Sequence, residues 1–535
     1  MLEAETDDPA TEAAEQTSTV ALETQAPPVE SFESTQEKHD AVKTERLGWS
    51  FALKIAAACI ALIVLVGTIS AFISQYRSRN KSSNTEAKSI AVLPFKNLSA
   101  ESADETLGYG IADALIAKLG NAGRLSVRPT SAIERYSFDQ SPLTVGRELQ
   151  VDFVLEGNVQ RNGDHVHVNA RLLRANDGAQ VWAGSFDERF TDIFTLQDRL
   201  SVQVAEALTI KLTDEERRRL AKHHTENAEA YEAYLRGRFF WNKRQTGQEQ
   251  AKDYFQRAIE IDPNYAPAYA GLAEVLATER MPSLEAERAA RRALEIDDTL
   301  AEAHAALGFI RMFHYWDFAA AERELRRAIE LRANYSTAHQ WYALLLAVKG
   351  QPEEAKARMR RALEIDPLSV GINADMGLLL FFNREYDEAI RQCRKTLELD
   401  SDFVFAHYYL YWIYFKKGMQ TEAFDELLAY DRIVAAAARQ PFDDGAFREA
   451  YAAGGMKGFL RAKLQGTLAA GAPFKYSAAE YYTLLGEKDE AIEWLRRSVN
   501  EPNSFFTIFV GVNPIFDDVR PDPRYQDLIR NAGLA

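Results

Sequence analysis

The sequence predicts a multidomain protein with a disordered amino terminus, one transmembrane helix, an α/β domain and an all-α solenoid of helical repeats. Three observations support this fold class. Small residues return at intervals of 34 or 35 residues through the second half of the chain. An uncharged run of 19 residues extends from Ile55 to Ile73. Between these regions, short apolar runs alternate with helical patterns, as in an α/β domain.

The amino-terminal residues 1–47 carry twelve acidic and three basic residues and almost no large apolar side chains. Such a segment cannot bury enough surface to offset its loss of entropy, so we expect disorder. Residues 49–75 form a candidate transmembrane helix, because 19 uncharged residues span a bilayer core. A buried core helix and a cleaved signal peptide are the alternatives. Basic residues flank the span almost equally, so charge does not orient it. A polar linker follows at 78–88.

Residues 89–215 show the pattern of an α/β domain. The continuous apolar run 89–95 predicts a buried strand, and 105–119 carries leucine and isoleucine at helical spacing. A short helix is predicted at 143–149, and further strands at 125–128, 151–159, 166–172 and 181–186. Asn162-Gly163 predicts a hairpin turn, and Asp192 is the expected cap of a helix that ends near residue 212.

Residues 226–535 carry the helical repeats, which become degenerate toward the carboxyl terminus. One repeated position holds only small residues: Ala258, Ala293, Ala328, Ala362 and Thr396. Small residues on one helix face let the paired helix approach closely. Asp262-Pro263 and Asp366-Pro367 end repeated units, because proline cannot continue a helix. This period predicts six to eight stacked helical hairpins, each of which needs a neighbour to bury its apolar face.

The helix-pair pattern of one repeat is carried by Tyr269, Leu272, Ala273, Ala286, Ala290 and Ala293. It resembles the tetratricopeptide repeat (TPR) family. The resemblance covers about half of the chain and implies a non-catalytic scaffold that binds protein.

A second resemblance involves the α/β region, through the segments 89–99, 108–119, 151–173, 178–188 and 192–198. They are similar to the TolB-like amino-terminal domain of bacterial envelope proteins. With the segments 230–244 and 513–534, the order resembles CadC-type membrane regulators. That resemblance implies a single-pass protein of the bacterial inner membrane with a cytoplasmic amino terminus and periplasmic carboxyl-terminal domains. Residues 1–47 cannot form the winged helix of that group, so DNA binding is not implied.

The composition and the isolated motifs argue against an enzyme. The net charge of −16 disfavours nucleic-acid binding, and the two cysteines, Cys59 and Cys393, are interpreted as small hydrophobic residues. Gly108 and Gly110 follow the preceding strand too distantly for a phosphate-binding loop, so packing at a helix start is preferred. The histidine pairs His165 with His167 and His223 with His224 lack further ligands at metal-binding spacing. We expect no catalytic residue, no cofactor and no metal site.

Two polar patterns recur with the repeats. His304, His339 and His407 occupy one repeat position, where they either pack or titrate together as a pH sensor. Arginine pairs occur at 291–292, 326–327 and 360–361, each with a glutamate three or four residues later. This spacing predicts surface ion pairs rather than a phosphate-binding stripe.

The candidate binding site is an apolar stripe on the first helix of successive repeats. Its residues, the stripe residues, are Phe309, Met312, Leu344, Leu378, Phe381, Trp412 and Phe415. In TPR proteins this face lines the concave groove, so the stripe is expected to hold an extended or helical peptide with aromatic anchors. The alternative is that the protein's own residues 440–510 fill the groove.

The expected function is therefore that of a membrane-anchored, non-enzymatic envelope scaffold or sensor that binds protein partners through the TPR groove. The alternative is the signal-input part of a CadC-type transcriptional regulator or of a cyclase system whose effector domain is absent from this chain.

Overall fold

The computed structural model describes residues 88–98, 105–120, 125–133, 136, 140–208, 213, 223–242, 247–278, 284–470, 475–501 and 504–534. The chain divides into two compact units, Met1–Thr85 and Glu86–Ala535, and the second is described below. The expected disordered segment (1–47), the candidate span (49–75) and the linker (78–88), apart from its last residue, lie outside the described residues.

The expected localisation, a single-pass protein of the bacterial inner membrane with periplasmic carboxyl-terminal domains, is corrected by the structure. In the part of the chain that the structure describes, no helix combines the length and the apolar character needed to cross a bilayer. The longest described helices, α18 (Gln420–Ala437) and α19 (Gly445–Ala470), both carry charged side chains, including Asp431 and Lys463.

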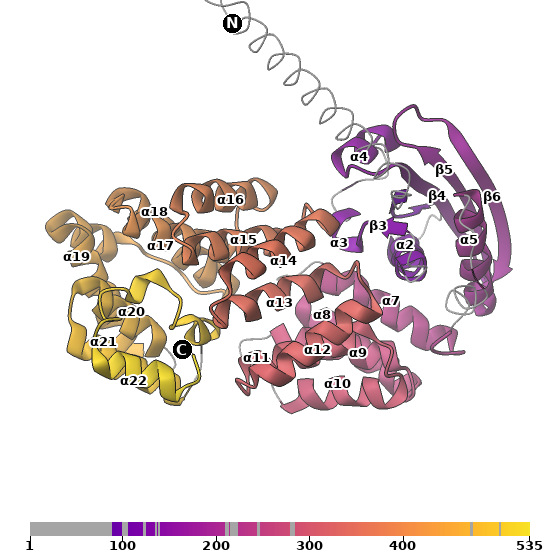
Figure 1. Ribbon diagram of the computed structural model, residues 1–535. Helices are drawn as coiled ribbons and strands as arrows, with labels where there is room; N and C mark the ends of the chain where they lie inside the picture. The colour runs from indigo at the N-terminus through magenta and orange to yellow at the C-terminus, as the bar shows by residue number, and fades with distance from the viewer. Residues whose placement is uncertain are drawn as a thin grey trace, which may run out of the picture. The chain divides into compact units, whose positions relative to one another are not determined.

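The α/β region contains a six-stranded mixed sheet with the path β3-β1-β4-β5-β6, and β2 pairs with β4 (Figure 1). The strands are β1 (Lys88–Val92), β2 (Lys96–Asn97), β3 (Leu125–Val127), β4 (Phe153–Asn162), β5 (His165–Arg174) and β6 (Gln180–Arg189). β1 runs parallel to β3 and β4, whereas β4, β5 and β6 are antiparallel neighbours. The predicted turn at Asn162-Gly163 joins β4 to β5, with Gly163 at a positive φ of 61°.

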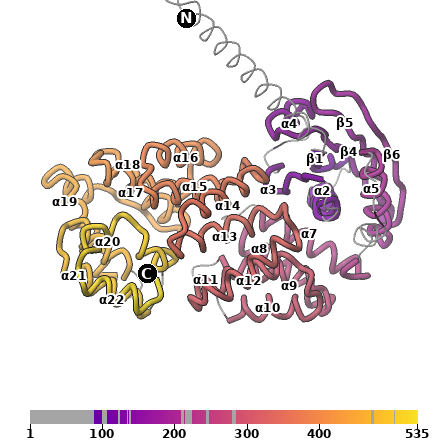
Figure 2. The backbone as a smooth tube through the Cα atoms, viewed as in Figure 1, coloured from indigo at the N-terminus to yellow at the C-terminus, as the bar shows by residue number. Residues whose placement is uncertain are grey.

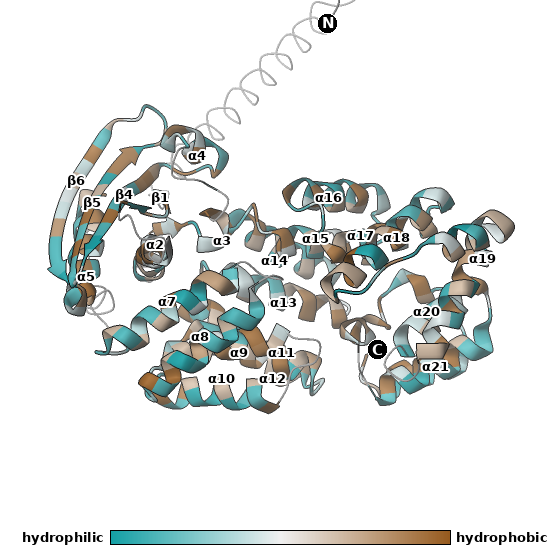
Figure 3. Cartoon of the chain, turned by 180° about the vertical axis from the view of Figure 1, so that it is seen from behind, coloured by the Kyte–Doolittle hydropathy of each residue, from teal (hydrophilic) through white to brown (hydrophobic). Residues whose placement is uncertain are grey.

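Alternation of residue type decides which face of the sheet is buried. Hydrophilic and hydrophobic residues alternate along β5 and β6 (Figure 3), and Val166, Val168 and Leu172 of β5 are buried. The helices of this region are α2 (Glu105–Gly120), α3 (Thr130–Ile133), α4 (Pro142–Glu148), η2 (Phe190–Asp192) and α5 (Ile193–Ala207). The apolar sides of α2 and α5 share one core with the sheet. Asp192 is the N-cap residue of α5, as predicted, although its side chain makes no capping hydrogen bond.

From α7 onward the described chain is a TPR-like all-α solenoid, as the repeat period predicts (Figures 1 and 2). Seven hairpins occur in the described residues. They are α7 (Ala228–Asn242) with α8 (Gln248–Ile261), α9 (Ala266–Thr278) with α10 (Leu284–Ile296), α11 (Ala301–Phe313) with α12 (Phe318–Leu331), α13 (Ser336–Val348) with α14 (Pro352–Ile365), α15 (Val370–Phe382) with α16 (Tyr386–Leu399), α17 (Val404–Lys416) with α18, and α20 (Lys475–Leu485) with α21 (Lys488–Asn500).

Small residues set the spacing within each hairpin. The five small residues that recur at one repeat position are all fully buried. At Gly377 of α15, an added Cβ would lie only 2.5 Å from the Sγ atom of Cys393 on α16, so even alanine would push the helices apart. Cys393 is itself fully buried, in agreement with its interpretation as a small hydrophobic residue.

The carboxyl-terminal segment, residues 504–534, follows the last hairpin. It contains η5 (Phe505–Phe509), η6 (Pro514–Phe516) and α22 (Pro523–Asn531). Each of these elements has a side-chain cap, because Ser504, Asn513 and Asp522 accept a hydrogen bond from a backbone N–H of the first turn.

A buried arginine joins the α/β region to the repeats. The Nε atom of Arg128 donates to the carbonyl of Leu149 at 2.9 Å, and its Nη1 atom donates to the carbonyl of Ile365 at 3.2 Å. Ile365 ends α14, where helix carbonyls lack intrahelical partners and carry partial negative charge. Beside it, the Ser131 hydroxyl donates to Asp366 at 2.5 Å. The two regions therefore share a polar joint.

Candidate functional site

The structure brings the stripe residues together on adjacent first helices. They lie on α11, α13, α15 and α17, and all except the half-buried Phe415 are at most 6% exposed. Two ring pairs lie on this face: Phe309 is 4.6 Å from Trp341 of α13, and Phe381 is 5.8 Å from Trp412, between centroids. We call these four rings the aromatic layer.

The carboxyl-terminal segment covers the aromatic layer. The ring of Phe506 lies 5.1 Å from that of Trp412, and Phe505 lies 4.4 Å from Phe313 at the end of α11. Phe509 lies 5.2 Å from Phe382 at the end of α15. These contacts correspond to the alternative in which the protein's own residues fill the groove, and η5 falls within the range 440–510.

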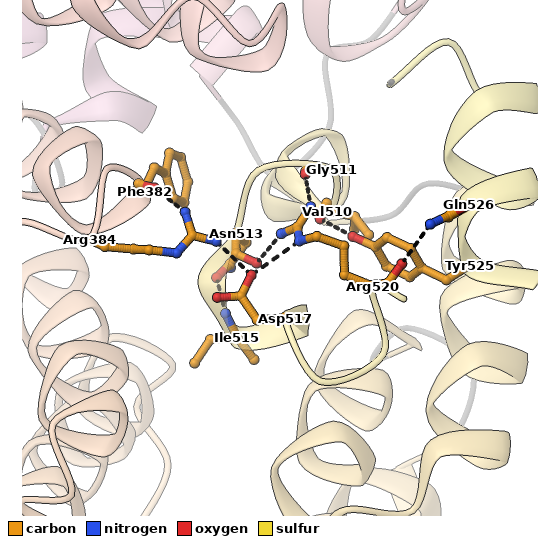
Figure 4. Close-up of polar contacts among 10 residues, drawn as sticks. All are labelled: Phe382, Arg384, Val510, Gly511, Asn513, Ile515, Asp517, Arg520, Tyr525 and Gln526. Carbon is orange, nitrogen blue, oxygen red and sulfur yellow. Dashed lines mark hydrogen bonds and ion pairs between the residues drawn. The ribbon is translucent and has the colours of Figure 1, made fainter. Parts of the chain in front are cut away.

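Polar contacts fix the carboxyl-terminal segment beside this layer (Figure 4). Asp517 lies between two guanidinium groups: Nη2 of Arg384 donates to it at 2.7 Å and Nε of Arg520 at 3.1 Å. Arg520 also donates to the backbone carbonyls of Gly511 and Asn513. Arg384 belongs to the α15–α16 turn, so this ion pair connects the repeats to the chain end.

Arg384 stands where the two neighbouring repeats have glycine, whereas the α11–α12 turn has Trp316 at the same position, with a φ of 52°. Gly350 and Gly418 lie 34 residues to either side, and all three residues have a positive φ, 68°, 63° and 75° in chain order. This left-handed conformation terminates a helix and is strained for any residue with a Cβ. This turn therefore places a cationic side chain on a strained backbone conformation.

Next to Arg384 is a cavity of about 520 Å³, the C-terminal pocket. It lies between the α13–α14 turn, the α15–α16 turn and the carboxyl-terminal segment. Its lining residues are Ala347, Gly350, Pro352, Glu353, Ala355, Leu379, Phe382, Asn383, Arg384, Glu385, Gly511, Val512 and Arg520. An apolar wall with a few polar groups is typical of small-molecule sites.

A second, polar cavity of about 100 Å³ lies where α2, α7, α9 and α11 meet. Arg238 lies 3.3 Å from a carboxylate oxygen of Asp113 and 3.5 Å from one of Glu274, and Arg332 lies 2.8 Å from Glu302. Burial raises the pKa of Glu274, and the positive charge of Arg238 opposes that effect. The charges pair among themselves, so this cluster is a buried structural joint.

The recurring histidines make structural hydrogen bonds. His304 and His407 pair with Glu324 and Glu426 at 2.7 and 2.6 Å, and His339 contacts the Ala333 carbonyl at 3.0 Å. Burial lowers the pKa of His339. Burial also opposes the charge of His407, but its hydrogen bonds to Glu426 and to a backbone carbonyl outweigh burial and raise its pKa. Opposite shifts argue against a set that titrates together.

The other sequence candidates have local structural roles. Gly110 lies within α2, where an added Cβ would lie 2.6 Å from Leu235, so it serves packing. His165 lies 3.6 Å from Asp187, and His223 lies 2.7 Å from Asp198. The predicted ion pairs of the arginine stripe are confirmed, for example Arg361 with Glu364 at 2.9 Å.

Sequence reasoning missed two buried acids. Glu480 of α20 is fully buried and accepts a hydrogen bond from the Tyr408 hydroxyl at 2.5 Å; burial raises its pKa to about 7. Asp375 accepts from Gln340 at 2.8 Å, and burial raises its pKa to about 6. Neither position stands out in sequence, because acidic residues are common in the repeats.

Comparison with known proteins divides the chain in the same way. Residues 86–203 match the second domain of HilA/YgeH-like transcriptional regulators, and residues 233–265 match the tetratricopeptide repeat. These matches support a regulator architecture that combines such a domain with TPR repeats. They also support protein–protein interaction, for which these repeats are known.

One curated relative is "Putative adenylate cyclase 3" of Rhizobium meliloti (strain 1021), 32% identical over 193 residues. The match covers 36% of this chain and 33% of the relative, so the chain spans about a third of that protein.

Among solved structures, a thermophilic TPR protein of Thermus thermophilus, TTC0263, is 18% identical with a TM-score of 0.29, covering 33% of this chain and 94% of that one. Pseudomonas aeruginosa PilF is 23% identical with a TM-score of 0.29, covering 39% and 99%.

Proposed function

We propose that this chain is a non-enzymatic regulatory scaffold that binds a protein partner on the first-helix face of its repeats. The proposal includes a TolB-like role for the α/β region as a docking module fixed to the repeats. The partner binds at the exposed edge of this face, because the chain's own segment covers the rest of it, and it supplies aromatic or large apolar side chains like those of that segment.

Phe405 is the observation that carries this proposal. It belongs to the first turn of α17 and is 38% exposed, unlike the buried rings beside it. Its ring lies 6.2 Å from that of Tyr409, which lies 6.0 Å from Trp412, so Phe405 extends the aromatic layer to the surface. An exposed aromatic ring at the edge of a rigid apolar layer is a suitable anchor for a partner.

The test is quantitative affinity capture by the full chain from its own cells, with Phe405→Ala compared with the wild type. Leu468→Ala is the matched control, because Leu468 is 39% exposed but belongs to α19. The proposal requires a partner whose capture falls at least about tenfold with Phe405→Ala and stays unchanged with Leu468→Ala. Equal capture of every partner by the three proteins would refute it.

The second candidate is the signal-input part of a transcriptional regulator or of a cyclase system. It is favoured by the match of residues 86–203 to a regulator domain and by the relative named as a putative adenylate cyclase. Both candidates assign no catalysis to this chain, and incubation of the purified chain with ATP and Mg²⁺, followed by chromatography, tests that shared assignment. Formation of cyclic AMP would overturn the non-enzymatic assignment.

A further inference from the structure

Part of the wall of the C-terminal pocket is apolar. Leu379 and Phe382 of α15 and Val512 of the carboxyl-terminal segment line it. Its volume of about 520 Å³ falls within the range of small-molecule sites, about 300–1,000 Å³. A ligand in this pocket would remove its apolar group from water, so the wall selects for a large aromatic or branched group.

Two lining residues, Arg384 and Arg520, carry an excess of positive charge. Arg384 and Arg520 both donate to the single carboxylate of Asp517, which leaves one positive charge uncompensated within these three groups. Guanidinium donors are suited to a carboxylate.

Two other lining residues, Glu353 and Glu385, carry an excess of negative charge. Glu353 and Glu385 line the pocket, and both pair with the single ammonium group of Lys356, at 2.9 and 2.6 Å. One negative charge therefore remains uncompensated within this group. A purely anionic ligand would satisfy the arginine side and be repelled here, whereas an ammonium group would be attracted.

We propose that the C-terminal pocket binds a zwitterionic small molecule of the α-amino acid class with a large apolar side chain. Its carboxylate accepts from Arg384, its ammonium group donates to Glu385, and its side chain packs on Leu379 and Phe382. The site is independent of the partner surface proposed above.

Four probes that differ in one group each test this assignment by ligand-observed NMR titration of the full chain. L-Phenylalanine carries all three groups, 3-phenylpropanoate lacks the ammonium, 2-phenylethylammonium lacks the carboxylate, and glycine lacks the ring. L-Phenylalanine is expected to bind at least about tenfold more tightly than each of the others, the effect of one charge-assisted hydrogen bond or one buried ring. Equal affinity of 3-phenylpropanoate, or no binding of L-phenylalanine, overturns the proposal.

Two variants test separately the residue proposed to bind the carboxylate and the residue proposed to bind the ammonium group. Arg384→Gly removes the guanidinium and restores the residue that neighbouring repeats use at this turn. It is expected to lower the affinity for L-phenylalanine and for 3-phenylpropanoate about tenfold, but not the affinity for 2-phenylethylammonium. Glu385→Gln is expected to lower the affinity for L-phenylalanine and for 2-phenylethylammonium, but not the affinity for 3-phenylpropanoate.

The control is Arg391→Gln, which removes an exposed arginine of α16 that pairs with Glu388 outside the pocket. Its affinities are expected to match those of the wild type. If Arg384→Gly and Arg391→Gln bind all four probes equally, the ligand does not contact Arg384 and the proposal is wrong.

Discussion

Replacing Arg384 by glycine and by alanine separates backbone strain from the ion pair. Both variants lose the contact with Asp517, but only alanine keeps a Cβ at the positive φ of 63°. The left-handed conformation costs a residue with a Cβ about 1–2 kcal/mol. Glycine avoids this strain, but its greater conformational freedom in the unfolded chain lowers the free energy of unfolding by about 0.4–1 kcal/mol. The glycine variant should therefore be more stable than the alanine variant by about 0.5–1 kcal/mol.

The ion pair itself contributes little. The Arg384 side chain is 50% exposed, and exposed pairs contribute about 0.2–1 kcal/mol. The loss of the pair and the relief of strain nearly cancel in Arg384→Gly, which should remain within about 1 kcal/mol of the wild type.

Hydrogen exchange of peptides that span the α15–α16 turn measures the strain difference as a local opening free energy, and peptides from residues 504–534 measure the loss of the ion pair. Local opening suits a chain of several domains better than global unfolding. Asp517→Asn is the control for the ion pair, because it leaves the backbone of the turn untouched. An alanine variant as stable as the glycine variant would refute the assignment of strain to Arg384.

Three further predictions concern buried groups. Phe506→Ala should lower the opening free energy of the carboxyl-terminal segment by about 3–5 kcal/mol, whereas Leu468→Ala, at an exposed site, should change it by less than about 0.5 kcal/mol. Because burial raises the pKa of Glu480 to about 7, the folded protein holds this proton more tightly than the unfolded chain. Stability should therefore fall by about 3 kcal/mol as the pH rises from about 4.5 to 7, and then level off. Urea midpoints should lose this dependence in Glu480→Gln, and a steep wild-type profile in that variant would exclude Glu480 as its source. Arg128→Met should leave the carbonyls of Leu149 and Ile365 without their donor and destabilise the joint by about 2–3 kcal/mol, seen as faster hydrogen exchange of residues 125–133. Unchanged exchange would show that the joint does not depend on Arg128.

The repeats and the sheet were predictable because their patterns are local. The recurrence of small residues such as Ala293 and Ala328 reports the spacing within each hairpin, and alternation along 166–172 reports one buried face of a strand. The hairpin at Asn162-Gly163 was predictable for the same reason, since glycine tolerates the positive φ of the turn.

The packing of the carboxyl-terminal segment on the aromatic layer was not predictable from local sequence patterns. Phe505 packs on Phe313, almost 200 residues earlier, and nothing in the run 505–509 indicates which helix it contacts. Arg384 differs: the glycines 34 residues before and after it mark a turn position that requires a positive φ, so the sequence itself identifies Arg384 as a strained residue. The net charge of the groups around Asp517 was not predictable from the sequence, because it depends on contacts in three dimensions.

The contacts of η5 change the order in which the repeats of the solenoid are expected to unfold. In an open array each repeat touches only its neighbours, so unfolding can begin at an end and proceed one unit at a time. Here Phe505 contacts both Phe313 of α11 and Phe405 of α17, and Phe506 also contacts Tyr476 of α20. Release of η5 therefore removes support from an early hairpin as well as from the last ones. Repeats from α11 to α21 are thus coupled into one cooperative melting unit, and truncation before η5 would weaken a hairpin far from the cut.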